Sequence, residues 1–323
     1  VKLSGIEVID ASTATSAVKI DLSKQTDSFT IIGSAYADTI LGGSGDDRIV
    51  NLIATDTMDG GGGRDTLVLT ATSAELNSLT DARLKNVEVI DASAASTGVT
   101  LNLAAQSDGF TILGSAYNDT ITGSSGADSI SAGDGDDTIK DPVNADSIYG
   151  GAGTDRIVLT HTSTSLNSLT DAKLDGVEII DASGATSAVA INLSQQSEGF
   201  TIIGSAHVDT IIGSAGDDRV LGLIASDTMD GGAGRDTIVL SATSTELNNL
   251  SNAQLRNIEV IDASGATSGV TIDLSQQNDG FTIIGSAYAD TIKASSFVDT
   301  ISAGDGDDLI IDPVAADSIA GGK

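Results

Sequence analysis

The sequence predicts an all-β fold, a right-handed parallel β-roll or β-solenoid, from three features of its spacing. Aspartates recur every nine residues, as at Asp38, Asp47, Asp56 and Asp65. A large apolar residue follows each of them two positions later, and glycines precede the best copies. Glycine permits a tight turn at positive φ, and an apolar residue between two outward-facing ones fits a short strand. A turn and a strand that repeat at a short fixed period indicate a solenoid.

The best copies carry a specific glycine pattern. Residues 42–50 read GGSGDDRIV and residues 60–68 read GGGGRDTLV, and both match the nonapeptide G-G-x-G-x-D-x-U-x, in which U is a large apolar residue. The chain therefore resembles the RTX family of secreted bacterial proteins. The resemblance implies that a nonapeptide forms half a coil and that alternate turns stack on one edge with Ca²⁺ between them. It also implies ligands from turn carbonyls and Asp side chains, the hard oxygen donors that Ca²⁺ requires.

The same count recurs in four arrays, each with glycine-rich turns and degraded ones. We expect the glycine-rich turns to hold several Ca²⁺ ions. The metal residues predicted there are Asp47 and Asp65 with Gly42 and Gly60, Asp137 and Asp155 with Gly133 and Gly150, Asp218 and Asp236 with Gly213 and Gly231, and Asp308. The degraded turns carry the secondary candidates Asp38, Asp56, Asp119, Asp128, Asp146, Asp209, Asp227, Asp290, Asp299 and Asp317.

A plain turn is the competing interpretation of every one of these aspartates. Asp is favoured in turns because its side chain hydrogen-bonds its own backbone, and this explanation competes on equal terms at the degraded turns. At the glycine-rich turns it is weaker, because glycines at several fixed positions together with Asp at the sixth are a far more specific requirement.

Composition favours a calcium-binding protein outside the cell. The chain has 46 acidic and 15 basic residues, a net charge of −31, so the metal-free chain repels itself and bound cations would relieve the repulsion. Extracellular calcium modules bind at about 10⁻⁴ to 10⁻³ M. The acidity excludes a nucleic-acid partner, which needs a basic face. There is no cysteine for disulfides or thiolate metal sites, and no apolar run approaches the ~18 residues of a membrane span.

A larger repeat encloses the nonapeptides. The segments 6–12, 87–93, 177–183 and 258–264 are variants of IEVIDAS, at offsets of 81, 90 and 81 residues. They divide the chain into units at 1–83, 84–173, 174–254 and a truncated 255–323. The second and fourth units carry one nonapeptide more than the others, so we expect them to end on the opposite edge of the coil. Because the chain stops inside a nonapeptide, we expect an internal piece of a longer protein.

Short helices are expected just before some IEVIDAS segments. At 72–76 and 243–247 a Thr precedes a Glu by three residues and forms a capping box. The copy at 162–165 lacks the Glu, so its helix should be weaker. We expect Leu76, Leu79 and Leu84 to close the end of the preceding roll rather than to bind a partner.

No enzyme motif is present, so we expect no catalytic activity. The two histidines, His161 and His207, do not recur in the other units and are expected on the surface. Neither a G-x-S-x-G elbow nor an H-E-x-x-H zinc helix occurs.

Two functional classes remain open at this point. One is a structural region of a surface layer, surface filament or adhesin stalk, secreted by a type I system as the resemblance implies. It would associate with itself or with neighbouring repeats, and with cell-surface polysaccharide as a further candidate partner. The alternative is an accessory module of a secreted RTX enzyme that modifies polysaccharides, lipids or proteins. A catalytic domain encoded upstream in the full gene would favour the alternative, and many further repeats would favour the structural region.

Overall fold

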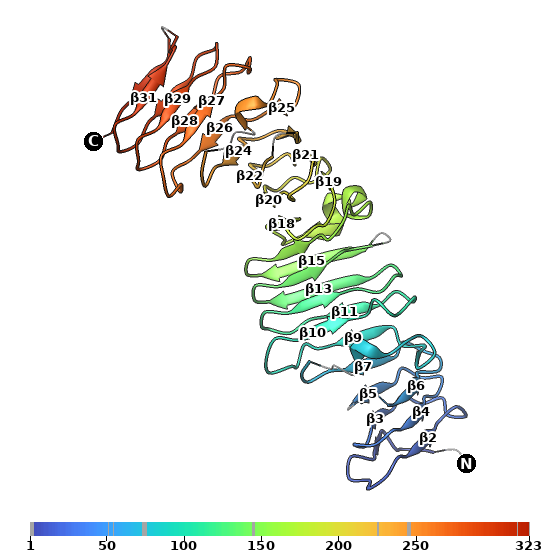
Figure 1. Ribbon diagram of the computed structural model, residues 1–323. Coiled ribbons are helices and arrows are strands. Elements are labelled where there is room, and N and C mark those ends of the chain that lie inside the picture. The colour runs from blue at the N-terminus through green and yellow to red at the C-terminus, as the bar shows by residue number, and fades with distance from the viewer. Residues whose placement is uncertain are drawn as a thin grey trace. The chain divides into compact units, whose positions relative to one another are not determined.

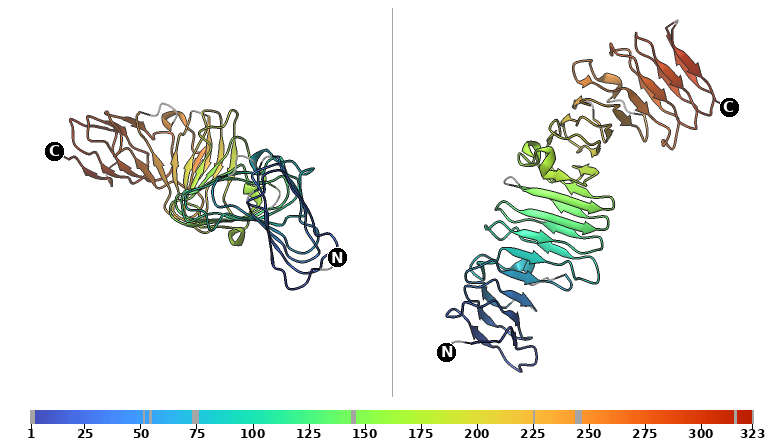
Figure 2. Two further views of the ribbon diagram at one scale, coloured as in Figure 1. Left: turned by 90° about the horizontal axis from the view of Figure 1, so that it is seen from below. Right: turned by 180° about the vertical axis from the view of Figure 1, so that it is seen from behind.

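A coil of short strands joined by turns makes up the structure (Figure 1). It is a computed structural model that describes residues 3–50, 52–53, 55–72, 76–143, 146–224, 226–243, 247–314 and 316–322. Two compact units divide the chain, the first comprising 1–157 with 172–177 and the second 158–171 with 178–323. Within each unit the strands lie side by side in flat rows, as two further views also show (Figure 2). The expected all-β solenoid is confirmed.

The elements up to residue 175 are β1 (Val8–Asp10), β2 (Lys19–Asp21), β3 (Thr30–Ile32), β4 (Thr39–Leu41), β5 (Arg48–Val50), β6 (Thr57–Asp59), β7 (Thr66–Val68), η1 (Leu76–Ser78), β8 (Leu84–Lys85), β9 (Val89–Asp91), β10 (Thr100–Asn102), β11 (Thr111–Leu113), β12 (Thr120–Thr122), β13 (Ser129–Asp134), β14 (Thr138–Lys140), β15 (Ser147–Ala152), β16 (Arg156–Val158), η2 (Leu166–Ser168), η3 (Asp171–Lys173) and β17 (Leu174–Asp175). They are followed by β18 (Ile179–Asp181), β19 (Ala190–Asn192), β20 (Thr201–Ile203), β21 (Thr210–Ile212), β22 (Arg219–Leu221), β23 (Thr228–Asp230), β24 (Thr237–Val239), η4 (Leu247–Asn249), β25 (Leu255–Arg256), β26 (Val260–Asp262), β27 (Thr271–Asp273), β28 (Thr282–Ile284), β29 (Thr291–Lys293), β30 (Thr300–Ser302), β31 (Leu309–Ile311) and β32 (Ser318–Ala320).

Alternate strands pair in parallel, so the odd and the even strands form opposite faces of the coil in each unit. In the first unit the odd strands β1 to β17 form a nine-stranded sheet, and the even strands form the rows β2-β4-β6-β8 and β10-β12-β14-β16. In the second unit the even strands β18 to β32 form one row, and the odd strands form β19-β21-β23-β25 and β27-β29-β31. One turn of the coil therefore uses two strands, as the nine-residue half coil requires.

The core is a ladder of apolar side chains between the two sheets. Ile31 pairs with Ile49, Ile49 with Leu67, Leu67 with Ile90 and Ile90 with Ile112, all in register. Each of these five side chains is fully buried, which stabilises the fold by about 1.5–3 kcal/mol per residue. The central residue of each of these three-residue strands points inward, and in Ile49 and Leu67 it is the apolar residue two positions after an aspartate.

The IEVIDAS segments contribute one strand to each repeat. Eight strand positions separate β1 from β9 and β18 from β26, whereas nine separate β9 from β18. An even count places two strands in the same sheet, as it does for β1 and β9, and the additional nonapeptide expected in the second unit stays a prediction. The unit boundaries at 84, 174 and 255 stay predictions.

A 3₁₀ helix precedes three of the IEVIDAS segments, as η1, η2 and η4. Each of these helices covers the exposed edge of a strand that follows it. Asn77 of η1 accepts the N–H of Asn102 through Oδ1 at 2.7 Å and donates Nδ2 to the carbonyl of Thr100 at 3.2 Å. The Oγ1 of Thr72 accepts the N–H of Thr100 at 2.9 Å. These side chains replace a neighbouring strand at the open edge of β10. The same arrangement recurs for Asn167 with Ala190 and Asn192, and for Asn248 with Thr271 and Asp273.

The leucines around these helices are buried, as expected. Leu76, Leu79 and Leu84 are at most 2% exposed, and η1 packs on β10 of the coil that follows. Residues 73–75 and 244–246, which include the Glu of each predicted capping box, lie outside the described residues. The copy without that Glu still forms η2, because the Oγ of Ser163 accepts the N–H of Leu166 at 3.0 Å.

Candidate metal centres in the turns

The turn aspartates stack in ladders along the edges of the coil. The N–H of Phe29 donates to Oδ1 of Asp47 at 2.8 Å, and the N–H of Asp47 donates to Oδ1 of Asp65 at 2.7 Å. The other two predicted pairs, Asp137 with Asp155 and Asp218 with Asp236, are linked in this way. The same link joins Asp290 with Asp308, Asp38 with Asp56, Asp119 with Asp137, Asp128 with Asp146, Asp209 with Asp227 and Asp299 with Asp317. Most are almost fully buried, whereas Asp308 and Asp317 are half-buried.

The second carboxylate oxygen, Oδ2, separates the turns into three types. In the first type, which we call capped turns, the N–H of the second turn residue donates to it. Ser34 donates in this way to Asp38 at 2.6 Å, and Gly43 donates to Asp47 at 2.8 Å. The other capped turns hold Asp119, Asp128, Asp209, Asp218, Asp290 and Asp299.

In the second type, the wide turns, the N–H of the residue three positions before the aspartate donates to Oδ2. Ile53 donates its N–H to Asp56 at 2.8 Å, and Val143 donates to Asp146 at 2.8 Å. Asp227 and Asp317 are capped in the same way. In the capped and wide turns both oxygens of each carboxylate accept N–H groups, as the plain-turn interpretation requires, and the metal role predicted for Asp47 and Asp218 stays a prediction.

Two glycines at positive φ distinguish the third type, the glycine turns. Residues 60–65, 132–137, 150–155, 231–236 and 303–308 each hold two glycines at positive φ, such as Gly61 at 100° and Gly63 at 108°. The Oδ2 atoms of Asp65, Asp137 and Asp236 are buried and accept no hydrogen bond. Burying a carboxylate oxygen without a partner is costly, so these atoms mark where a cation fits.

Burial and neighbouring charge raise the pKa of these three carboxyl groups. Burial is the largest cause in each case, and it raises the pKa of Asp137 to about 7 with a further contribution from Asp119, Asp155 and Asp136. The pKa of Asp65 is raised to about 6, with repulsion from Asp47 and Glu88 adding to burial. The pKa of Asp236 is raised to about 6 in the same way. A bound cation would favour the ionised carboxylates and so oppose all three shifts.

Two stacked glycine turns occur together, within the described residues, only at 132–137 and 150–155. There β13 and β15 extend into the turns, so that Gly133 pairs with Gly151 and Asp134 with Ala152. A Cβ on Gly133, at φ 119°, would collide with the carbonyl oxygen of Ser115. The glycines therefore bring backbone carbonyls and acidic side chains of successive coils into close contact.

The first glycine of a turn lies directly beside the candidate ligands. A Cβ on Gly60 would meet both Oδ2 of Asp65 and the carbonyl oxygen of Asn86 from the next coil. The corresponding atoms confine Gly42, Gly150, Gly213 and Gly231. The structure therefore explains why these predicted positions exclude a side chain, while their role toward a metal stays a prediction.

Sequence reasoning missed two acidic residues at the ends of ladders. The N–H of Asp65 donates to Oε2 of Glu88 at 2.8 Å, and that of Asp236 donates to Oε2 of Glu259 at 2.8 Å. Each Glu thus takes the place of the next turn aspartate. The signal was the Glu that recurs in every IEVIDAS segment, but its distance of 23 residues from the aspartate departs from the stacking interval of 18.

The donor set fits Ca²⁺. Among the described residues no three acidic or histidine side chains converge on one point, so carbonyl oxygens and water would complete a coordination of six to eight oxygens. The glycine turns offer buried carboxylate oxygens and turn carbonyls and contain no histidine, cysteine or methionine, which is the chemistry of a hard cation.

Comparison with known protein families agrees with this geometry. The model of the family described as RTX calcium-binding nonapeptide repeat (4 copies) matches residues 30–51, 54–68, 111–139, 144–159, 203–238 and 284–311. These segments are RTX calcium-binding repeats, and together with the β-solenoid fold they fit an RTX β-roll protein. They contain all five glycine turns, and such repeats bind Ca²⁺. A comparison with curated proteins found no match.

The remaining predictions concern the surface. His161 and His207 are exposed, as expected. In the part of the chain that the structure describes, no helix is both long and apolar enough to cross a membrane. The assignment of individual aspartates and glycines as metal ligands stays a prediction.

Proposed function

We propose that the chain is an extracellular, calcium-dependent structural repeat region of a surface layer, surface filament or adhesin stalk, whose β-roll folds and stiffens on binding Ca²⁺. The observation that carries this proposal is the buried Oδ2 without a donor in the glycine turns of Asp65, Asp137 and Asp236. Without a cation these carboxylates add to the repulsion of a chain with net charge −31. Each occupied site reverses that penalty and ties two coils together.

Repetition supports a structural role. A solenoid is stabilised by contacts between neighbouring coils, so its stability and length grow with the number of repeats. A site filled at ten times its dissociation constant adds about 1.4 kcal/mol, and several such sites decide whether the roll is folded at low calcium. The proposal includes secretion by a type I system, association with neighbouring repeats, and cell-surface polysaccharide as a candidate partner.

Calcium titration of the full chain tests the proposal. Circular dichroism and calorimetry would follow the β-sheet signal and the bound ions as Ca²⁺ replaces a chelator, and single-molecule pulling would measure the unfolding force. We expect all three to rise together in the ~0.1–1 mM range typical of extracellular sites. Mg²⁺ at the same concentration should not replace Ca²⁺, because it demands a smaller octahedral site. An unchanged spectrum and unfolding force in chelator would refute the proposal.

A further inference from the structure

The glycine turns 60–65 and 231–236 differ from their partners on the preceding coil. In the capped turn below, both oxygens of Asp47 accept backbone N–H groups, from Phe29 and Gly43. The carbonyl of Gly43 accepts the N–H of Gly62 at 2.9 Å. The capped turn therefore has its acidic side chain already engaged, and the buried Oδ2 of Asp65 has no available acidic partner on that side.

The coil on the other side offers suitable oxygens. Asn86 adopts φ 48°, a left-handed conformation, and its Nδ2 holds the turn in place by donating to Oδ1 of Asp59 at 2.7 Å. In this conformation the Asn86 carbonyl lies over Gly60, next to Oδ2 of Asp65. Glu88 follows two residues later and uses only Oε2 to accept the N–H of Asp65.

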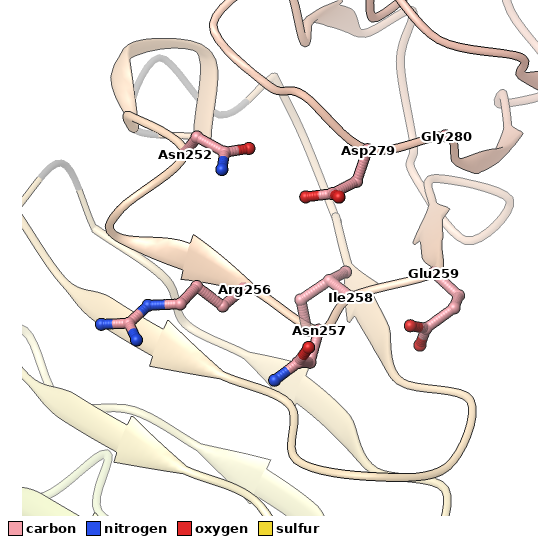
Figure 3. Close-up of a pocket in the computed structure, with 7 residues that line it drawn as sticks. All are labelled: Asn252, Arg256, Asn257, Ile258, Glu259, Asp279 and Gly280. Carbon is pink, nitrogen blue, oxygen red and sulfur yellow. The ribbon is translucent and has the colours of Figure 1, made fainter.

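The second unit repeats the arrangement with its own residues. Asn257 has φ 51° and donates Nδ2 to Asp230 at 2.6 Å, its carbonyl lies over Gly231 beside Oδ2 of Asp236, and Glu259 accepts the N–H of Asp236. Glu259 also lines a polar hollow with Asn252, Arg256, Asn257 and Asp279 (Figure 3). The hollow gives a hydrated ion access to the Glu259 side of the turn.

We propose that each of these arrays ends in a calcium site built from one nonapeptide turn and one IEVIDAS segment, with Glu88 and Glu259 as the acidic ligands from the segment. The other protein ligands are the carboxylates of Asp65 and Asp236 and the carbonyls of Asn86 and Asn257. Water completes the shell, as is usual for Ca²⁺. The site rests on the proposed function in requiring that the repeats bind Ca²⁺, and it adds ligands from outside the nonapeptides.

The double variant E88Q/E259Q tests the site. Gln keeps the oxygen that accepts the Asp65 and Asp236 N–H groups but removes the charge. Calorimetric titration of the full chain with CaCl₂ should show about two fewer ions bound, or the corresponding affinities weakened by about tenfold or more. The variant E7Q is the matched control, because Glu7 occupies the same position of the first IEVIDAS segment, where its side chain is exposed. It should bind like the wild type.

The outcomes separate this inference from the proposed function. If the wild type binds no Ca²⁺, the proposed function fails. If the wild type binds and E88Q/E259Q keeps the same stoichiometry and affinities, only the terminal site is wrong. Circular dichroism at saturating Ca²⁺ establishes whether the variant is folded. Anomalous scattering from crystals of the wild type grown with Ca²⁺ provides the second measurement, and ions between 42–47 and 60–65 with none beside Glu88 would overturn the site.

Discussion

Replacing Asp137 by Asn should stabilise the chain without calcium and weaken it with calcium. Oδ1 of Asp137 accepts the N–H of Asp119 at 2.7 Å, and the Asn carbonyl can keep that bond. Its buried Oδ2 meets no donor, so an NH₂ group there faces no backbone N–H. The substitution therefore removes a buried charge without removing a hydrogen bond.

The raised pKa gives the magnitude. For a carboxyl whose pKa rises from 3.8 to about 7, ionisation in the folded chain costs up to about 4 kcal/mol more than in the unfolded chain, at ~1.4 kcal/mol per pH unit. At pH 8 with chelator, we expect D137N to raise the free energy of unfolding by about 1–4 kcal/mol. At 100 times the dissociation constant, the wild type gains about 2.7 kcal/mol from this site, and D137N should lose that gain.

Urea unfolding at pH 8, with chelator and with saturating Ca²⁺, measures both effects. D38N is the matched control, because Asp38 accepts N–H groups at both oxygens, from Val18 and Ser34. An Asn there points NH₂ at a backbone donor and should cost about 1–3 kcal/mol with and without calcium. The reasoning is refuted if D137N is destabilised in chelator, or if it keeps the full calcium gain.

Three further predictions follow from the turns and the strand edge. Without calcium, the chain should become more stable as pH falls from about 8 to 5, measured as the urea midpoint in chelator. The folded pKa values of Asp65, Asp137 and Asp236, about 6 to 7, exceed the unfolded value of 3.8. The stabilising contribution of these three groups is therefore complete below about pH 4 and lost as pH rises through 7. Saturating Ca²⁺ should reverse this trend. A urea midpoint in chelator that decreases as the pH is lowered from 8 to 5 would contradict the prediction. The variant G133A should lower the free energy of unfolding by about 1–3 kcal/mol, since Gly133 has φ 119° and a Cβ would strike Ser115. The control G184A, with nothing near its Cβ, should change thermal stability little. Equal effects of the two variants would argue against the turn geometry. Replacing Asn77 by Ala should cost about 1 kcal/mol and speed hydrogen exchange at the Asn102 amide, which it caps; unchanged exchange would show that β10 does not depend on the cap.

The sequence was sufficient for the coil and its stacking. The nine-residue period placed Ile49 and Leu67 on one row of the coil, and the structure pairs them in register. The aspartates linked by the ladder bonds are likewise those that the period put on one edge. Both results follow from counting alone, because strand side chains alternate and turns of equal length superpose.

The conformation of individual turns could not be obtained that way. Residues 42–47 and 60–65 both have glycine at the first, second and fourth positions, yet positive φ occurs only in the second of them. The difference follows from the coil beneath: Ser44 donates its N–H to the carbonyl of Gln25 in a segment without the repeat, whereas Gly62 donates to Gly43 in another turn. Such neighbours are 19 residues apart and carry no local signal.

The side-chain caps on β10, β19 and β27 have a consequence for how such a chain changes length in evolution. Since Asn77, Asn167 and Asn248 each close a strand edge from within the chain, a recombination event that adds or deletes a block bounded by these caps creates no bare edge, and bare edges invite aggregation. Gene duplication and loss can therefore act on intact blocks, and the product of each event remains a soluble, foldable coil.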